Sequence, residues 1–248
     1  MVIITAVTIV LVLVTSSYAY QVLGRQQASA EFNSVQKSFI SFHDAVRDVA
    51  WDRGGSRVAR FTVSSGSLEL LPSGTLEIKV KNESNIVLAA YSCETAFIRY
   101  TLSTKYLTFG EGYEYYIIGN NESFVTSSSS TFGQALIKQE GSFVNITLNY
   151  GIQVLTSSPP TLINGVPVSY VDILVIKIGI PKKTAYVGEF DLTARNLNII
   201  TYASYVVNQQ GNWAVTARLG EIEDTVTLKL AQGNAVINFV VAEVQVST

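Results

Sequence analysis

The stretch Met1-Val-Ile-Ile-Thr-Ala-Val-Thr-Ile-Val-Leu-Val-Leu-Val-Thr-Ser-Ser-Tyr-Ala-Tyr-Gln-Val-Leu-Gly24 opens the chain and contains no charged side chain. About 20 apolar residues in a helix, at ~1.5 Å per residue, cover the ~30 Å hydrocarbon core of a bilayer. The apolar side chains point in all directions around such a helix. We therefore expect a helix that must be surrounded by lipid or by protein.

The residues that follow continue the helix with one apolar face. The apolar positions are spaced 3, 4, 3, 4 and 3 apart, which places them on one stripe of a helix. They are expected to pack the helix against the rest of the protein, and they are Phe32, Val35, Phe39, Phe42, Val46 and Val49. The polar residues expected to turn away from the stripe are Gln36, Lys37, His43, Asp44, Arg47 and Asp48.

The end of the helix is predicted near Ala50. No proline occurs before Pro72, and Gly54-Gly55 supplies a stop signal. The chain thus divides into an N-terminal helix at 1–53 and a β-rich domain at 57–248. One helix of about 50 residues is ~75 Å long, far more than a bilayer requires.

From Arg57 onward the hydrophobic period changes from 3.6 to 2. Gly74–Val80 and Thr225–Leu230 alternate cleanly, and each predicts a strand with one buried face. Gln232-Gly233-Asn234 predicts a turn that joins the second of these strands to Ala235–Val246 as a terminal hairpin. The nearly continuous apolar run from Val171 to Ile180 predicts a central strand buried on both faces.

These elements predict an α+β protein in which a long apolar helix precedes a sandwich-like β domain. Polar loops are expected at 119–133 and 157–167, where Gly, Asn, Ser and Pro gather. The second loop allows two sheets in series that divide near residue 158, and one elongated sandwich is equally compatible with the pattern.

The composition speaks against several functions. With a net charge of −2 and no basic stripe, nucleic-acid binding is not expected. Cys93 is the sole cysteine, so no intrachain disulfide forms, and we interpret it as a small buried hydrophobe. The only histidine, His43, is expected on the exposed flank of the helix, where it cannot support a catalytic triad.

Acidic clusters offer no stronger sign of catalysis. Glu111 with Glu114, and Glu221 with Glu223 and Asp224, lack the spacing of a calcium loop and are interpreted as solvated turn residues. No phosphate-binding loop is present in the sequence. We therefore predict a protein that is not an enzyme and that needs neither a metal nor a cofactor.

Two sets of residues are candidates for the outer surface. Tyr113, Tyr115 and Tyr116 form an aromatic segment that is either a packing strand or a contact patch. Asn82, Asn121 and Asn145 each begin an N-glycosylation acceptor pattern, which matters if the chain is exported.

The first quarter of the chain resembles archaeal type IV pilins and the related archaellins. The resemblance rests on the apolar helix from Ile3 to Leu23, on its amphipathic extension through Phe32, Phe39, Phe42 and Val49, and on the β-rich body after Gly54-Gly55. The segments Ala45–Ala50, Arg57–Val63 and Ser67–Leu70 also look like the junction of helix and sheet in such pilins. Thr5 stands where bacterial pilins carry an acidic residue, which points to the archaeal branch.

This resemblance implies an extracellular filament subunit. In that family a prepilin peptidase removes a short basic leader, which would account for the absence of basic residues ahead of Ile3. The assembly machinery then moves the subunit from the membrane into a homopolymer, with the helices in the filament core and glycosylated β domains outside. The residues expected in that core are Ile3, Ile4, Val7, Val10, Leu11, Leu13, Val14, Tyr18, Val22 and Leu23. Met1 is either an initiator residue or a processed terminus.

The sequence therefore predicts the structural subunit of an archaeal adhesion pilus, and it leaves three alternatives open. An archaellin, the subunit of a swimming filament, has the same architecture. A monomeric binding protein anchored in the cell envelope would use the helix only for retention. A secreted enzyme with an uncleaved signal would show activity in the region that begins near Arg57.

Overall fold

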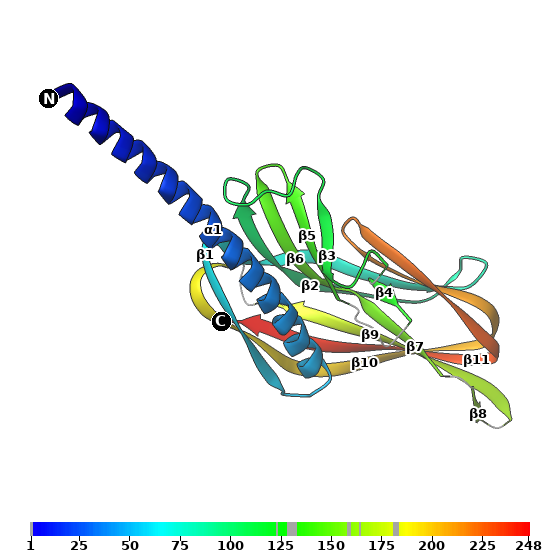
Figure 1. Ribbon diagram of the computed structural model, residues 1–248. Coiled ribbons are helices and arrows are strands. Elements are labelled where there is room, and N and C mark those ends of the chain that lie inside the picture. Colours follow the sequence, from blue (N-terminus) through cyan, green and yellow to red (C-terminus); the bar gives the residue numbers. More distant parts are fainter. Residues whose placement is uncertain (1, 123, 128–132, 158–159, 164, 181–183) are drawn as a thin grey trace.

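The computed structural model describes residues 2–248 except 123, 128–132, 158–159, 164 and 181–183. For residues 2–3, 6, 205–210 and 231–232 it describes the backbone alone. One helix, α1 (Val2–Ala50), precedes a β-rich body, as the sequence predicts. The N-terminal half of α1 projects from the body, and the C-terminal half lies along it (Figure 1). Gly54, at a φ of 80°, turns the chain from the helix into the first strand.

The described strands form one 11-stranded sheet in the order β3-β5-β6-β2-β1-β10-β11-β9-β7-β4, with β8 paired to β9. The bounds are β1 (Ser56–Lys81), β2 (Val87–Ser103), β3 (Glu114–Ile118), β4 (Val125–Thr126), β5 (Gly133–Glu140), β6 (Phe143–Tyr150), β7 (Ile152–Thr156), β8 (Thr161–Ile163), β9 (Val166–Gly179), β10 (Thr184–Leu219) and β11 (Ile222–Ser247). Both alternating segments, Gly74–Val80 and Thr225–Leu230, lie in strands as predicted.

The terminal hairpin differs from the prediction. The residues around Gly233 do not end a strand, because β11 continues through them and pairs with β10 on both sides. The turn lies instead at Gly220-Glu221, where Leu219 faces Ile222. The turn-like sequence at 232–234 lies opposite a change of register between Val206 and Gly211 of β10. The two paired strands bend together there, and neither strand ends in a hairpin turn.

This bend brings the end of the ribbon back over the body (Figure 1). β1 therefore contacts β10 twice, with Val58 opposite Thr193 and Ile78 opposite Ala217. The sheet consequently covers two separate cores, and each core takes residues from both sides of residue 158. The chain does not divide into successive sheets at that point.

The first core lies between the sheet and α1. The predicted stripe residues of the helix are each at most 2% exposed. Phe39 and Phe42 pack on Phe61 of β1, with ring centroids 5.7 Å and 6.3 Å apart. The second core lies inside the bent ribbon, where Trp213 packs with residues of β1, β7, β9 and β11. β9 runs parallel to β11 and is flanked by β7, and so holds the central position predicted for Val171–Ile180, although one face is only half-buried.

His43 corrects one expectation. The residue is 5% exposed, and its ring stacks on Tyr150 of β6 with centroids 5.7 Å apart. It is buried because the sheet curls past the stripe and covers the neighbouring flank of the helix as well. A Cβ atom at Gly133 would lie 2.7 Å from the His43 ring, so this close approach requires a glycine in β5.

We predict that acid destabilises the body through His43. Burial lowers the pKa of His43 from 6.5 to about 4, and nearby Arg47 acts in the same direction while Asp44 opposes it. Between these two pH values the unfolded chain binds a proton that the folded chain does not, so the free energy of unfolding falls as the pH falls from 6.5 to 4. The loss attributable to His43 approaches about 3 kcal/mol.

The measurement is chemical denaturation between pH 7 and 4 of the wild type and of His43→Phe, which keeps the ring against Tyr150. The wild type should lose more stability than the variant over this interval. Equal losses would mean that the ring is protonated in the folded protein.

Candidate assembly surface

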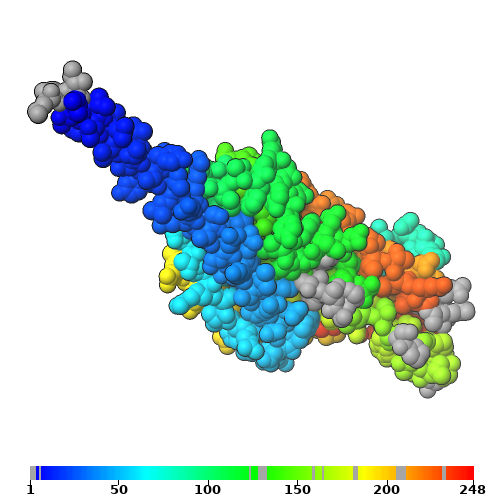
Figure 2. Space-filling view, in the orientation of Figure 1, coloured from blue at the N-terminus to red at the C-terminus, as the bar shows by residue number. Residues whose placement is uncertain are grey.

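The N-terminal half of α1 exposes its apolar side chains to solvent. The exposed fraction of the large apolar residues between 4 and 23 ranges from 50% at Leu23 to 76% at Tyr20, apart from Val22, which is half-buried. They are Ile4, Val7, Ile9, Val10, Leu11, Val12, Leu13, Val14, Tyr18, Tyr20 and Leu23. The side chain of Ile3 lies outside the described residues. Figure 2 shows this segment extending well beyond the β-rich body.

Removing this surface from water would release considerable free energy. Complete burial of a large apolar side chain is worth about 1.5–3 kcal/mol, so partial burial of eleven of them provides on the order of 10 kcal/mol. By length and composition the helix is also able to cross a membrane, and the apolar window that qualifies it is not buried inside the protein. The apolar half of α1 therefore needs lipid or protein around it.

Polar groups within this segment are compatible with such surroundings. Thr8 Oγ1 donates to the Ile4 carbonyl at 2.9 Å, and Thr15 Oγ1 donates to the Leu11 carbonyl at 2.8 Å. Each hydroxyl thus finds its acceptor one turn back in the same helix, which lowers the cost of placing it in an apolar environment. The first charged residue is Arg25, just before the helix reaches the body.

Glu31 fastens α1 to the body where the projecting half begins. Its carboxylate accepts hydrogen bonds from the backbone N–H groups of Ser64, Ser65 and Gly66, at 2.9, 2.8 and 3.2 Å, and from the Tyr100 hydroxyl at 2.8 Å. The three N–H groups are available because the register of β1 on β10 shifts between Val63 and Leu68. Burial raises the pKa of Tyr100, and its bond to Glu31 acts in the same direction.

Asn196 of β10 fastens the other end of the helix. Its Nδ2 atom donates to the carbonyls of Val49 at 3.1 Å and Ala50 at 2.6 Å, and its backbone N–H donates to Gly55. Carbonyl groups in the last turn of a helix have no partner within the helix, so this side chain acts as a cap from a distant strand. The two attachments hold α1 without a flexible linker.

Neither Glu31 nor Asn196 could be identified as a joint residue from the sequence. Glu31 occupies an ordinary polar position of an amphipathic helix, and Asn196 lies about 145 residues beyond the carbonyls that it caps. No local sequence pattern predicts either contact.

We predict that Glu31→Ala loosens the attachment of the projecting helix. The substitution leaves three backbone N–H groups and one hydroxyl without their acceptor, each of which costs about 1–3 kcal/mol if it stays away from water. Amide hydrogen exchange at Ser64, Ser65 and Gly66 should become faster while exchange in the distal core around Trp213 stays unchanged. Glu31→Gln keeps one carbonyl acceptor and should give an intermediate effect. Equal exchange rates at these three amides in the wild type and both variants would contradict the role of Glu31.

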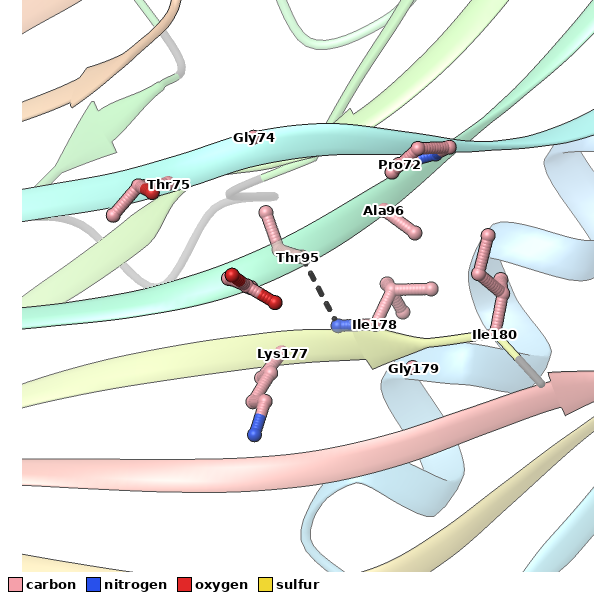
Figure 3. A pocket seen from close by; sticks show the side chains of 10 residues that line it. Pro72, Gly74, Thr75, Thr95, Ala96, Lys177, Ile178, Gly179 and Ile180 are labelled. Atoms are coloured by element: carbon pink, nitrogen blue, oxygen red, sulfur yellow. Dashed lines mark hydrogen bonds between the residues drawn. The ribbon is translucent and has the colours of Figure 1, made fainter. Parts of the chain in front are cut away.

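A pocket lies at the seam between the two cores, lined by residues of β1, β2 and β9 (Figure 3). Thr95 Oγ1 accepts a hydrogen bond from the Ile178 backbone N–H at 3.2 Å and so joins β2 to the end of β9. Lys177 points away from Thr95, and its Nζ atom is 2.8 Å from a carboxylate oxygen of Glu243 in β11. At this pocket β2 is thus hydrogen-bonded to β9, and the lysine that lines the pocket is held in an ion pair with β11.

The described residues contain no group of three or more His, Cys, Asp or Glu side chains that could hold a metal ion. Cys93 is half-buried, and burial raises the pKa of its thiol. Asp224 is not simply solvated, because its carboxylate accepts a hydrogen bond from the Val125 N–H at 2.9 Å.

The tyrosine segment has both inner and outer members. Tyr113 stacks on Phe109 with centroids 4.6 Å apart and packs on the first core. Tyr115 is 55% exposed, and Tyr116 is half-buried. The packing interpretation thus applies to Tyr113, whereas Tyr115 is available for contacts with other molecules.

We predict opposite consequences for two serine substitutions. Tyr113→Ser should lower the free energy of unfolding by about 1–3 kcal/mol, because it removes a partly buried ring from the core. Tyr115→Ser should change it by less than about 0.5 kcal/mol. Chemical denaturation measures both, and equal effects would argue against this assignment of the two rings.

The predicted glycosylation sites lie in two environments. Asn82 accepts a hydrogen bond from the Ile86 N–H in the turn between β1 and β2. Asn121 and Asn145 line a common groove, and Thr101 donates to the Asn145 carbonyl oxygen at 2.9 Å. Ser123, the hydroxyl residue of the second acceptor pattern, lies outside the described residues.

Comparison of the chain with family models, with curated proteins and with solved structures gave no match.

Proposed function

We propose that this protein is a structural subunit that assembles into an extracellular filament of the archaeal type IV pilus class through the apolar half of α1. The observation that supports the proposal is a single helix that is fixed to the body at one end and uncovered at the other. A second copy of the same helix provides an apolar surface of equal length. Repeated lateral packing of such helices generates an open-ended polymer.

The attachment of α1 to the body favours a polymer over a simple anchor. Glu31 and Asn196 set the direction of the helix relative to the body, so that helices packed in a bundle would place their bodies in a fixed arrangement outside. A membrane anchor needs no such rigid joint. The proposal leaves open whether the filament adheres, as in a pilus, or rotates, as in an archaellum.

An anchored envelope protein is the second candidate, and a specific feature favours it. Tyr18 and Tyr20 are 69% and 76% exposed near the end of the apolar segment, just before Arg25. Aromatic residues followed by a basic residue are typical of a helix end at the membrane surface. In this candidate function the protein stays monomeric in the lipid bilayer.

The first experiment is electron microscopy of material sheared from the cells that produce the protein, with mass spectrometry of the same fraction. Filaments composed mainly of this chain would support the proposal, and a motility assay would then distinguish pilus from archaellum. Recovery of the chain only as a monomer in the membrane fraction would reject the filament.

We predict that Val10→Lys abolishes filaments while the body remains folded. A charged group in the middle of the apolar helix costs roughly 2.5–3.5 kcal/mol in a membrane and cannot be paired inside a bundle of apolar helices. Asn33→Lys, at an exposed position on the attached half of α1, is the matched control and should assemble normally. Normal filaments from the Val10→Lys variant would contradict the proposed surface.

A second variant separates a filament from an anchor. Helices in an apolar environment associate through close packing at small side chains, whereas an anchor requires only hydrophobicity. The triple substitution Ser16→Leu, Ser17→Leu and Ala19→Leu makes the segment more apolar and bulkier. We expect it to retain the protein in the membrane and to reduce filament yield severely; full yield would show that helix packing does not hold the assembly together.

A further inference from the structure

A polar groove lies on the face of the sheet that points away from α1. One wall is formed by alternate residues of β5 and β6 with neighbours from β2 and β3, and the other by Glu221 to Glu223 at the turn of the bent ribbon. The groove has a volume of about 370 Å³. This volume falls within the roughly 300–1,000 Å³ typical of ligand sites.

The turn is held in place over the sheet. The Asp224 carboxylate accepts hydrogen bonds from the backbone N–H groups of Val125 and Thr225, at 2.9 and 2.8 Å. The ribbon turn lies beside β3 in Figure 1, and its residues Glu221 to Glu223 line the groove together with residues of β3, β5 and β6. The turn that forms the second wall is therefore attached to β4, a strand of the same sheet.

Neutral hydrogen-bonding groups dominate the wall that the sheet forms. Gln134 faces Asn149 across β5 and β6, and the next pairs along are Leu136 with Thr147 and Lys138 with Asn145. Two amides are already oriented, since Gln134 donates to the Asn120 carbonyl at 2.7 Å and Asn145 accepts from Thr101. Each oriented amide retains a second polar atom of known character, an acceptor on Gln134 and a donor on Asn145.

The charged groups of the sheet wall are paired with one another. Lys138 lies 3.2 Å from Glu114 and 3.1 Å from Glu140, and Arg99 lies 2.9 Å from Glu69. Because these cations are paired and Glu221 and Glu223 on the other wall are exposed carboxylates, the groove does not favour an anion. The two carboxylates can instead accept hydrogen bonds from ligand hydroxyl groups.

From these contacts we propose that the groove binds a neutral saccharide. A saccharide presents hydroxyl groups that both donate and accept hydrogen bonds. A wall of amides and hydroxyls therefore suits a saccharide better than it suits a charged ligand. Its apolar C–H faces fit against Leu136 and the Tyr116 ring, which are neighbours across β3 and β5. The site is separate from the apolar helix, so it does not depend on the filament proposal.

The test uses the full chain, produced in a host without N-glycosylation and held in dodecylphosphocholine, because a detergent with a sugar headgroup would compete. Saturation-transfer NMR is recorded against neutral oligosaccharides of glucose, mannose, galactose and N-acetylglucosamine, each three to six units long. We expect at least one of them to bind. No transfer from any of the four series would overturn the proposal.

Variants locate the binding. Thr147→Val removes only the hydroxyl group from the groove and should weaken affinity about threefold to tenfold, the effect of one lost hydrogen bond. Asn149→Ala should weaken it at least as much. Thr193→Val, on a half-buried threonine of β10 outside the groove, is the matched control and should bind like the wild type. Equal affinity of the Thr147→Val variant and the control would place the saccharide elsewhere.

The state of Asn145 in the native protein provides an independent check. A glycan attached there would occupy the groove covalently and leave no room for an exchangeable ligand. Mass spectrometry of the peptide that contains Asn145, from the cells that produce the protein, should find it unmodified; a glycan at this position would overturn the proposal.

Discussion

The packing of the second half of α1 against the sheet is the contact on which the rest of the molecule depends. Six stripe residues, spaced to face one direction, lose nearly all contact with water when β1 and its neighbours close over them. At about 1.5–3 kcal/mol for each large apolar side chain, this burial is sufficient to hold the helix in place. Glu31 and Asn196 contribute direction, because their hydrogen bonds fix the two ends of the buried segment. The exposed half is therefore a rigid extension of the body.

The bend in the β10–β11 ribbon is the second constraint. A straight antiparallel ribbon of this length would leave its apolar residues around Trp213 uncovered, and the irregular register near Gly211 allows the ribbon to turn back over β9 and β1. The bend forms a second core far from the helix and gives the sheet two layers there. It also carries the turn at Gly220 to the outer face of β5 and β6, where it forms the second wall of the polar groove.

The two proposed activities thus belong to opposite parts of one framework. The projecting helix offers an apolar surface with no charge before Arg25, which suits self-assembly or insertion into lipid. The groove offers paired charges, amides and hydroxyls on the far side of the sheet from α1, which suits a soluble polar ligand. If both proposals hold, a filament would carry saccharide sites on its outer surface, and adhesion would follow from the repetition of a weak site along the polymer.

The elements with a local sequence pattern could be predicted from the chain alone. The uncharged stretch, the 3-4 spacing of Phe32 to Val49 and the alternation from Gly74 to Val80 each arise from the geometry of one helix or strand, so they predicted α1, its buried stripe and the β-rich body. The features that depend on contacts between distant segments became visible only in the folded protein. In the fold the sheet covers His43, β11 is continuous through Gly233, Glu31 accepts from three N–H groups of β1, and Asn121 and Asn145 line one groove. These features follow from the path of the sheet in space, and the path depends on register shifts and long-range pairing that leave no periodic mark in the chain.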